Sequence, residues 1–208
     1  MLRPDQIPAI CRRFGGERRD AEGRGLDTVS LFDRRVAAVE VRECGEPLID
    51  LREVDALRLD RRPAGRRDDA PVRLRLGVVD RLVTAQTLLP AGLRLYVARG
   101  HHPEPPESPH ATGAAVDLTL CTAEGVPLWV GSDPRGARSP HRTVEVSAPD
   151  PVAAENRGHL RRAMTVAGFI NYPAVWRHWS YGDRYWACVT GIRFAGYGPV
   201  RGPGRRSG

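Results

Sequence analysis

The stretch that decides the fold reads Ser108-Pro-His110-Ala-Thr-Gly113-Ala-Ala115-Val-Asp117-Leu-Thr-Leu120. Apolar and polar residues alternate in its second half, which predicts a β-strand over residues 115–120 with Asp117 facing away from its apolar neighbours. Gly113 permits the turn that would bring His110 and Asp117 to one centre. Imidazole and carboxylate groups are both suitable ligands for zinc. The stretch therefore predicts two metal ligands at the start of a strand.

His178 is the third candidate ligand, and it lies in Trp176-Arg177-His178-Trp179-Ser-Tyr181. The aromatic side chains around it are suited to forming a small dry pocket. Three protein ligands with a fourth position left open are typical of catalytic zinc sites. Spacing alone leaves a second interpretation open, in which His178 is a packed and hydrogen-bonded histidine that binds no metal.

The remaining sequence favours an α+β protein over a doubly wound sheet, because the expected helices and strands do not alternate regularly. Apolar residues at three- and four-residue spacing predict helices over residues 72–89 and 152–167, and Gly168 is expected to cap the second. Residues 29–39 are amphiphilic and suit a helix or a strand that wraps the core. Short apolar or alternating runs predict further strands over residues 48–51, 93–97, 127–131 and 185–189.

The length of 208 residues suits a single domain with its own core. We expect an N-terminal arm with a flanking element over residues 1–42, the domain itself over 43–197, and a disordered tail rich in glycine, proline and arginine over 198–208. No apolar run is long enough to cross a bilayer, and the N-terminus lacks the apolar core of a secretory signal. We therefore expect a cytoplasmic protein without a membrane partner.

The composition narrows the class of protein further. Hydrophobic residues make up 41% and charged residues 27% of the chain, as in ordinary globular proteins. The net charge is +7, but the arginines are interleaved with acidic residues and lack the basic and aromatic pattern of single-strand binders, so nucleic-acid binding is not predicted. The four cysteines form no CxxC pair and are expected to be reduced and buried or half-buried.

Several separated blocks of the sequence resemble the D-alanyl-D-alanine dipeptidases, the family of the vancomycin-resistance dipeptidase. The stretch quoted first resembles the family's SxHxxGxAxD motif, and the stretch around His178 resembles its ExWH motif and the strand after it. The likeness extends roughly over residues 43–200. It implies the zinc-binding fold shared with Hedgehog signalling domains and D,D-carboxypeptidases, a single domain with a central antiparallel sheet flanked by helices. It also implies that zinc is the cofactor, held by His110, Asp117 and His178.

The sequence departs from the family pattern at three positions. Val175 stands where the ExWH motif has its catalytic glutamate, and Arg177 replaces the usual tryptophan. In Gly100-His101-His102-Pro103, His102 takes the place of the arginine that is thought to stabilise the oxyanion in the family's YRP motif. A positioned general base contributes about 10²–10⁴ in rate, and an oxyanion donor about 10²–10³. Efficient dipeptide hydrolysis by the family mechanism is therefore not expected.

These departures favour a zinc enzyme that acts non-hydrolytically, in biosynthesis, on a small amino-acid-like or peptide-like substrate. Zinc would act as a Lewis acid, and His102 or His101 as the acid and base. The substrate pocket would be lined by Ser108, Val175, Trp176 and Arg177.

Two alternatives stay open. The first is residual dipeptidase activity, with Asp183 or Glu107 supplying the function of the missing glutamate. The second is a non-catalytic binding module or pseudo-enzyme that uses zinc, or only the fold. The sequence does not define the oligomeric state.

Overall fold

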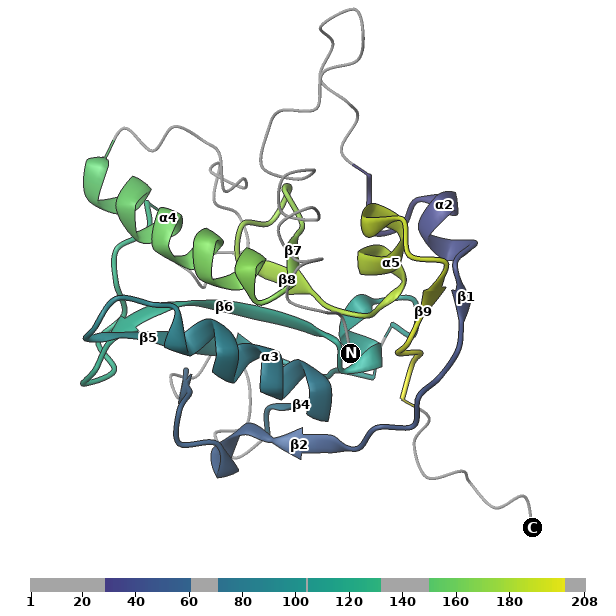
Figure 1. Cartoon of the computed structure of the whole chain (residues 1–208), viewed down its shortest axis with the longest axis horizontal. Helices are drawn as coiled ribbons and strands as arrows, with labels where there is room; N and C mark the ends of the chain where they lie inside the picture. The colour runs from purple at the N-terminus through teal and green to yellow at the C-terminus, as the bar shows by residue number, and fades with distance from the viewer. Residues whose placement is uncertain (1–28, 61–70, 104, 132–149, 201–208) are drawn as a thin grey trace, which may run out of the picture.

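The computed structural model describes residues 29–60, 71–103, 105–131 and 150–200 (Figure 1). Residues 61–70 lie outside these ranges, as does most of the tail expected to be disordered. The centre of the fold is a five-stranded sheet in the order β3-β5-β6-β8-β7. Its strands are β3 (Arg58–Leu59), β5 (Leu93–Arg99), β6 (Ala115–Thr122), β7 (Ile170–Asn171) and β8 (His178–Ser180).

The pairing in this sheet is antiparallel at every step except β3 with β5, which run parallel. β6 is buried along almost its whole length, as expected for a central strand that carries apolar side chains on both faces. The α+β prediction with a central, mainly antiparallel sheet is thus confirmed, and so are the strands expected after residues 93 and 115.

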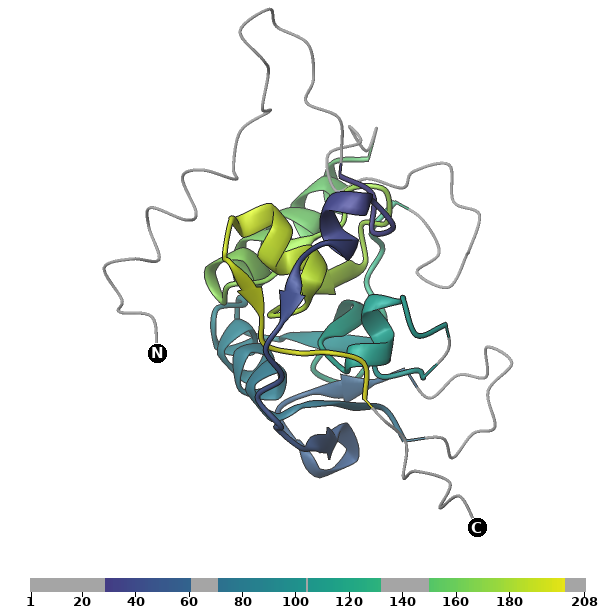
Figure 2. The ribbon, with the colours of Figure 1, turned by 90° about the vertical axis from the view of Figure 1, so that its right-hand side faces the viewer.

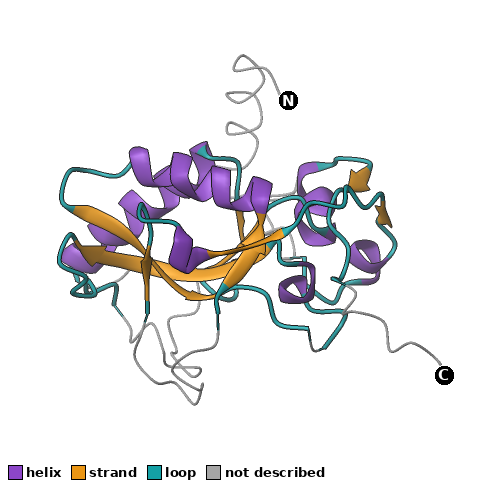
Figure 3. Ribbon diagram, turned by 90° about the horizontal axis from the view of Figure 1, so that it is seen from below, coloured by secondary structure: helices purple, strands orange, loops and turns teal. Residues whose placement is uncertain are grey.

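Two long helices, α3 (Leu76–Thr87) and α4 (Pro151–Val166), lie on one side of the sheet and contact each other (Figure 3). Their apolar sides complete the core together with β5 and β6. Asp150 begins α4 by accepting a hydrogen bond from Val152 N at 2.9 Å. Gly168, with a φ of 96°, ends it as the sequence predicted.

The helix predicted over residues 72–89 begins later than expected. Its first residues form β4 (Arg73–Arg75), which pairs antiparallel with β2 (Leu48–Asp50), a strand that was predicted. Val72 and Leu74 are both buried, and their two-residue spacing fits a strand as well as the helical pattern. The short helix η2 (Leu51–Glu53) follows β2.

The strand predicted over residues 185–189 is wrong, because this segment is helix α5 (Arg184–Thr190). Asp183 accepts a hydrogen bond from Trp186 N at 2.8 Å and so caps the first turn. Gly191, with a φ of 73°, ends the helix after two turns. These end signals outweigh the strand-like run of aromatic and β-branched residues. The strand expected over residues 127–131 is also wrong, since within the described chain only an isolated bridge forms there.

The segments before and after the central sheet lie side by side (Figure 2). Helix α2 (Arg34–Ala37) contacts α5, and β1 (Glu40–Val41) pairs in parallel with β9 (Phe194–Ala195). The amphiphilic stretch at residues 29–39 thus contains a helix. The domain boundary at residue 43 stays a prediction.

Two further expectations concern the cysteines and the membrane. Cys121 is buried and Cys188 is half-buried, as expected, but Cys44 is exposed and Cys11 lies outside the described residues. Among the helices in the described ranges, none is long and apolar enough to cross a membrane.

Candidate metal centre

The structure brings the three candidate ligands together from three separate elements. His110 lies on the short helix η3 (Pro109–Thr112), Asp117 on β6, and His178 at the start of β8. Asp117 Oδ1 is 3.3 Å from His110 Nε2 and 3.0 Å from His178 Nδ1. One potential ligand atom from each residue lies within 4.8 Å of the others, and all three residues are buried. This group could hold a metal ion.

Strand pairing fixes two of these side chains on the same face of the sheet. Asp117 on β6 is directly opposite His178 on β8, and Arg99 on β5 is opposite Asp117 on its other side. Directly opposed residues in antiparallel strands present their side chains to one face. Arg99, Asp117 and His178 therefore form one row across three strands.

A tight turn delivers His110 to the end of this row. Ser108 begins η3, where its side chain accepts a hydrogen bond from His110 N at 3.3 Å, and Gly113 ends it with a φ of 71°. The ring atom Nδ1 of His110 lies 3.0 Å from the carbonyl oxygen of Gly100. Because a carbonyl only accepts, we assign the proton to Nδ1, which leaves the lone pair of Nε2 directed toward Asp117.

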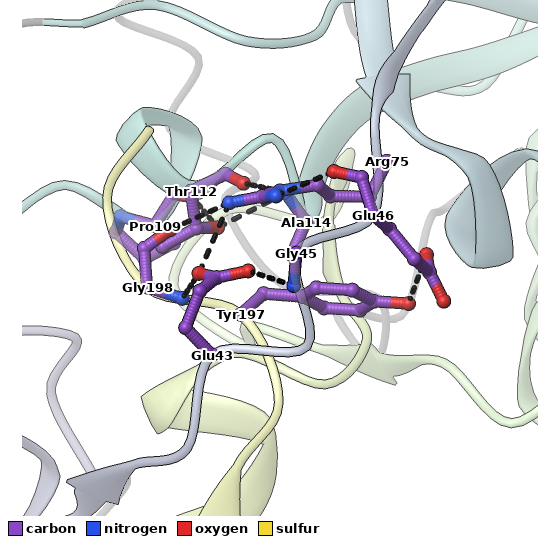
Figure 4. Close-up of polar contacts among 9 residues, drawn as sticks. All are labelled: Glu43, Gly45, Glu46, Arg75, Pro109, Thr112, Ala114, Tyr197 and Gly198. Carbon is purple, nitrogen blue, oxygen red and sulfur yellow. Dashed lines mark hydrogen bonds and ion pairs between the residues drawn. The ribbon is translucent and has the colours of Figure 1, made fainter. Parts of the chain in front are cut away.

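The turn is held from behind by the buried guanidinium of Arg75 (Figure 4). Its Nε donates to the carbonyl of Thr112 at 2.8 Å, and its two terminal nitrogens donate to the carbonyls of Glu46 and Gly198 and to the Glu43 carboxylate. Arg75 thereby ties η3 to segments near both ends of the described chain.

Neighbouring groups complete this support, which the sequence analysis missed. The Tyr197 hydroxyl donates to Glu46 Oε2 at 2.8 Å, and Gly198 N donates to Glu43 Oε2 at 2.8 Å. Thr112 Oγ1 donates to the carbonyl of Pro109 at 2.6 Å, inside the turn itself. The sequence offers one weak hint of this support, which is Arg75. It is a charged residue among the apolar positions of Val72-Arg-Leu-Arg75-Leu, and the helical pattern gives no reason for it.

The protonation states suit a metal cation. Burial lowers the pKa of His110, although the hydrogen bond to Asp117 opposes this effect. Burial alone would raise the pKa of Asp117, but its hydrogen bonds to His110 and His178 outweigh burial and hold that pKa far below its usual range. The cluster thus favours an ionised carboxylate beside a neutral imidazole of His110, which are the forms that bind zinc.

The two histidines predicted to act as acid and base lie in the segment that follows β5, next to η3. His101 and His102 are both half-buried. The backbone N–H of His102 donates to the carbonyl of His110 at 3.1 Å, which holds this segment alongside the turn. Within the described chain, His101 Nε2 is buried without a hydrogen-bond partner, and burial lowers the pKa of His101. Burial thus favours the neutral imidazole of His101 and makes it a weaker base than an exposed histidine.

The residues that precede His178 form the turn between β7 and β8. His178 N donates to the carbonyl of Val175 at 2.8 Å, so the half-buried Val175 side chain lies one turn from the cluster. Arg177 Nε is 4.0 Å from Asp117 Oδ2. Trp176, by contrast, is only 3% exposed, and its ring packs under the guanidinium of Arg157. Trp176 therefore supports the turn from the core rather than lining an open pocket.

Neither residue considered as a substitute for the glutamate is well placed for that role. Asp183 is 1% exposed and is engaged as the cap of α5, and burial raises its pKa. Glu107 is exposed, in the turn that precedes η3.

Comparison with known proteins points to one family. The model of the family described as D-ala-D-ala dipeptidase matches residues 95–190, which include all three candidate ligands. A curated protein of Synechocystis sp., "D-alanyl-D-alanine dipeptidase", is 39% identical over 90 residues, which cover 38% of this chain and 36% of the relative. The chain thus spans about a third of the length of the curated relative it matches.

Proposed function

We propose that the chain is a divergent member of the D-Ala-D-Ala dipeptidase family, as its similarity to the family model and to the curated dipeptidase supports, and that it is a zinc-dependent enzyme with a reaction other than hydrolysis. One observation carries the proposal: Val175, with a hydrocarbon side chain, lies three residues before His178 of the buried His-Asp-His cluster, at the position where the family pattern has the glutamate. The proposed substrate is a small amino-acid-like or peptide-like molecule in a biosynthetic reaction.

The contacts of His110 support a metal ion at this cluster. With its proton on Nδ1, His110 directs a lone pair at Asp117 Oδ1 across 3.3 Å, and that oxygen is itself an acceptor. A bound cation would join these two acceptors, whereas without one the contact requires a second proton on His110, which makes the hydrogen bond to Asp117. His110 Nε2, Asp117 Oδ1 and His178 Nδ1 would hold the ion. Zinc bound there would polarise a carbonyl and lower the pKa of bound water to about 7.

Val175 argues against hydrolysis because a hydrocarbon side chain can neither accept a proton from water nor return one to a leaving group. A positioned general base typically accelerates a reaction by about 10²–10⁴, and this acceleration of hydrolysis is lost with the glutamate. His101 and His102 are half-buried, in a segment that is hydrogen-bonded to η3 through His102 N. We propose that their imidazoles transfer protons to and from the substrate in place of the glutamate.

Residual dipeptidase activity is the second candidate, and the 39% identity to a curated dipeptidase favours it. It would need another proton acceptor in the pocket. His101 fits this role better than Asp183, since Asp183 is committed to capping α5.

Two measurements on the purified protein test the proposal. Titration calorimetry with zinc should show one site that is lost in the His178→Gln variant. Release of free D-alanine from D-alanyl-D-alanine should stay at the level of an EDTA-treated sample. A zinc-dependent release would instead establish the dipeptidase, and a protein that binds no zinc would leave the pseudo-enzyme interpretation.

A further inference from the structure

A cavity of about 450 Å³ lies at the β3 edge of the central sheet. Its walls come from three segments: part of residues 51–59, which lead from η2 through β3, Tyr96 on β5, and the turn at residues 124–125 after β6. None of the three candidate metal ligands lines it. Small-molecule pockets typically enclose about 300–1,000 Å³. The cavity is therefore a second candidate binding site, separate from the His-Asp-His cluster.

Part of the cavity wall is apolar. Val54 and Leu59 are half-buried and pack against the core of the domain. Tyr96 is 6% exposed, and its hydroxyl donates to Asp60 Oδ1 at 3.0 Å. Because the polar end of Tyr96 is already bonded, its ring is the part left to contact a ligand. This wall suits a hydrocarbon group of a small molecule.

Four charged side chains also line the cavity, namely Arg52, Asp55, Arg58 and Glu124. Arg52 is paired with Asp50 at 2.6 Å. The other three are exposed, and none of them forms an ion pair with another residue of the described chain. Glu124 has a hydrogen bond with the side chain of Thr122, which carries no charge. One cation and two anions thus surround the cavity without neutralising one another.

We propose that this cavity binds a small zwitterion, a free amino acid with a hydrocarbon side chain. Arg58 binds its carboxylate, for which the planar donors of a guanidinium are suited. Asp55 and Glu124 attract its ammonium group. A simple anion would also face the two carboxylates, and a simple cation would also face Arg58. A molecule that carries both charges therefore fits this cavity better than either, and its binding does not depend on the proposed reaction at the metal centre.

The test is an NMR titration of the full-length, isotope-labelled chain with leucine. The amide signals of residues 51–59 and 124–125 should shift and saturate. Two further probes each lack one charge of leucine: isocaproate has no ammonium group, and isopentylamine has no carboxylate. Each should bind at least about threefold more weakly than leucine, because each loses an exposed ion pair.

Two variants assign the charges. Arg58→Gln should weaken the binding of leucine at least about threefold, and should weaken isocaproate but not isopentylamine. Glu124→Gln should weaken leucine and isopentylamine but not isocaproate. Both side chains are exposed, so neither substitution should prevent folding. Arg161→Gln is the matched control, since Arg161 is exposed on α4, and it should change none of the three titrations.

The inference is overturned if leucine produces no saturable shifts up to its solubility, if either single-charge probe binds as tightly as leucine, or if Arg58→Gln binds leucine like wild type. His178→Gln lacks a proposed metal ligand and should still bind leucine like wild type. Loss of leucine binding in that variant would place the leucine at the metal cluster and overturn the inference as well. A wild-type protein that binds leucine but no zinc would refute only the proposed function.

Discussion

At the scale of single residues, Val175 decides which reaction the site can support. Val175→Glu would place a carboxylate one turn from the cluster, where His178 N donates to the carbonyl of residue 175. We expect this variant, loaded with zinc, to release D-alanine from D-alanyl-D-alanine at least about 10² faster than wild type, because a positioned base contributes about 10²–10⁴.

The matched control is Val175→Gln, which has nearly the same shape but cannot act as a base. Its rate should stay at the wild-type level. Equal rates in the two variants would show that the turn does not aim residue 175 at the substrate.

His110 gives a prediction for the stability of the metal-free protein. Burial lowers its pKa below the ordinary value of 6.5, so the folded protein binds fewer protons than the unfolded chain below that pH. The free energy of unfolding should therefore decrease as the pH falls from about 7 to about 5. Urea titrations at several pH values measure this slope, which should become shallower in His110→Gln. An unchanged slope would assign the effect to other groups.

At the scale of elements, the sequence predicted the two longest strands of the central sheet and both long helices but exchanged a helix and a strand at two places. Residues 185–189 contain strand formers, yet Asp183 and Gly191 provide helix end signals on either side. The apolar spacing at residues 72–75 fits the periodicity of a helix as well as that of a strand, and only the pairing of β4 with β2 makes the segment a strand. The end signals beside residues 185–189 are local and indicate a helix, whereas the strand at residues 73–75 depends on a partner that is distant in the sequence.

Gly113 links one turn to the position of a proposed ligand. Its φ is 71°, and a Cβ added there would lie 2.5 Å from Leu48 Cδ2. Gly113→Ala should therefore destabilise the protein by about 1–2 kcal/mol for the left-handed backbone alone, with a further cost from the contact. Because the turn carries His110, zinc affinity should fall as well. Thermal unfolding and zinc titration measure the two effects.

Gly158→Ala provides the control with the opposite sign. Gly158 lies inside α4, and an added Cβ there meets nothing within 4 Å. This variant should stabilise the protein by about 0.5–1 kcal/mol and leave zinc affinity unchanged. Loss of zinc affinity in both variants would mean that the measurement reports general destabilisation.

At the scale of the whole molecule, Arg75 joins segments that are distant in the sequence. It donates to groups of Glu43 and Glu46, to Thr112 in the His110 turn, and to the carbonyl of Gly198. Arg75→Gln should destabilise the protein by about 1–3 kcal/mol, because it removes hydrogen bonds from a charged group to carbonyls that would lose their donor, and should weaken zinc binding. Arg73→Gln is the control, because Arg73 is exposed two residues earlier on β4. Similar losses in both variants would contradict a special role for Arg75.

The sequence motifs indicated all three residues of the candidate site, but not what holds them. His110 and Asp117 are close together in the sequence, within one motif over residues 108–117, and His178 lies in a second motif. The support of the turn is built from Arg75, Glu43 and residues near 198, whose proximity depends on the completed fold. Such long-range hydrogen bonds leave no periodic or spacing signal in a single sequence.

The segment that supports the His110 turn also sets an order of events during protein synthesis. Val200 N donates to the carbonyl of Ala111 at 2.8 Å, and the carbonyl of Gly198 accepts from Arg75. A nascent chain that has already exposed His178 still lacks both contacts, since residues 198–200 leave the ribosome later. The proposed zinc site is therefore completed only after residues 198–200 have left the ribosome, and uptake of the ion would follow it.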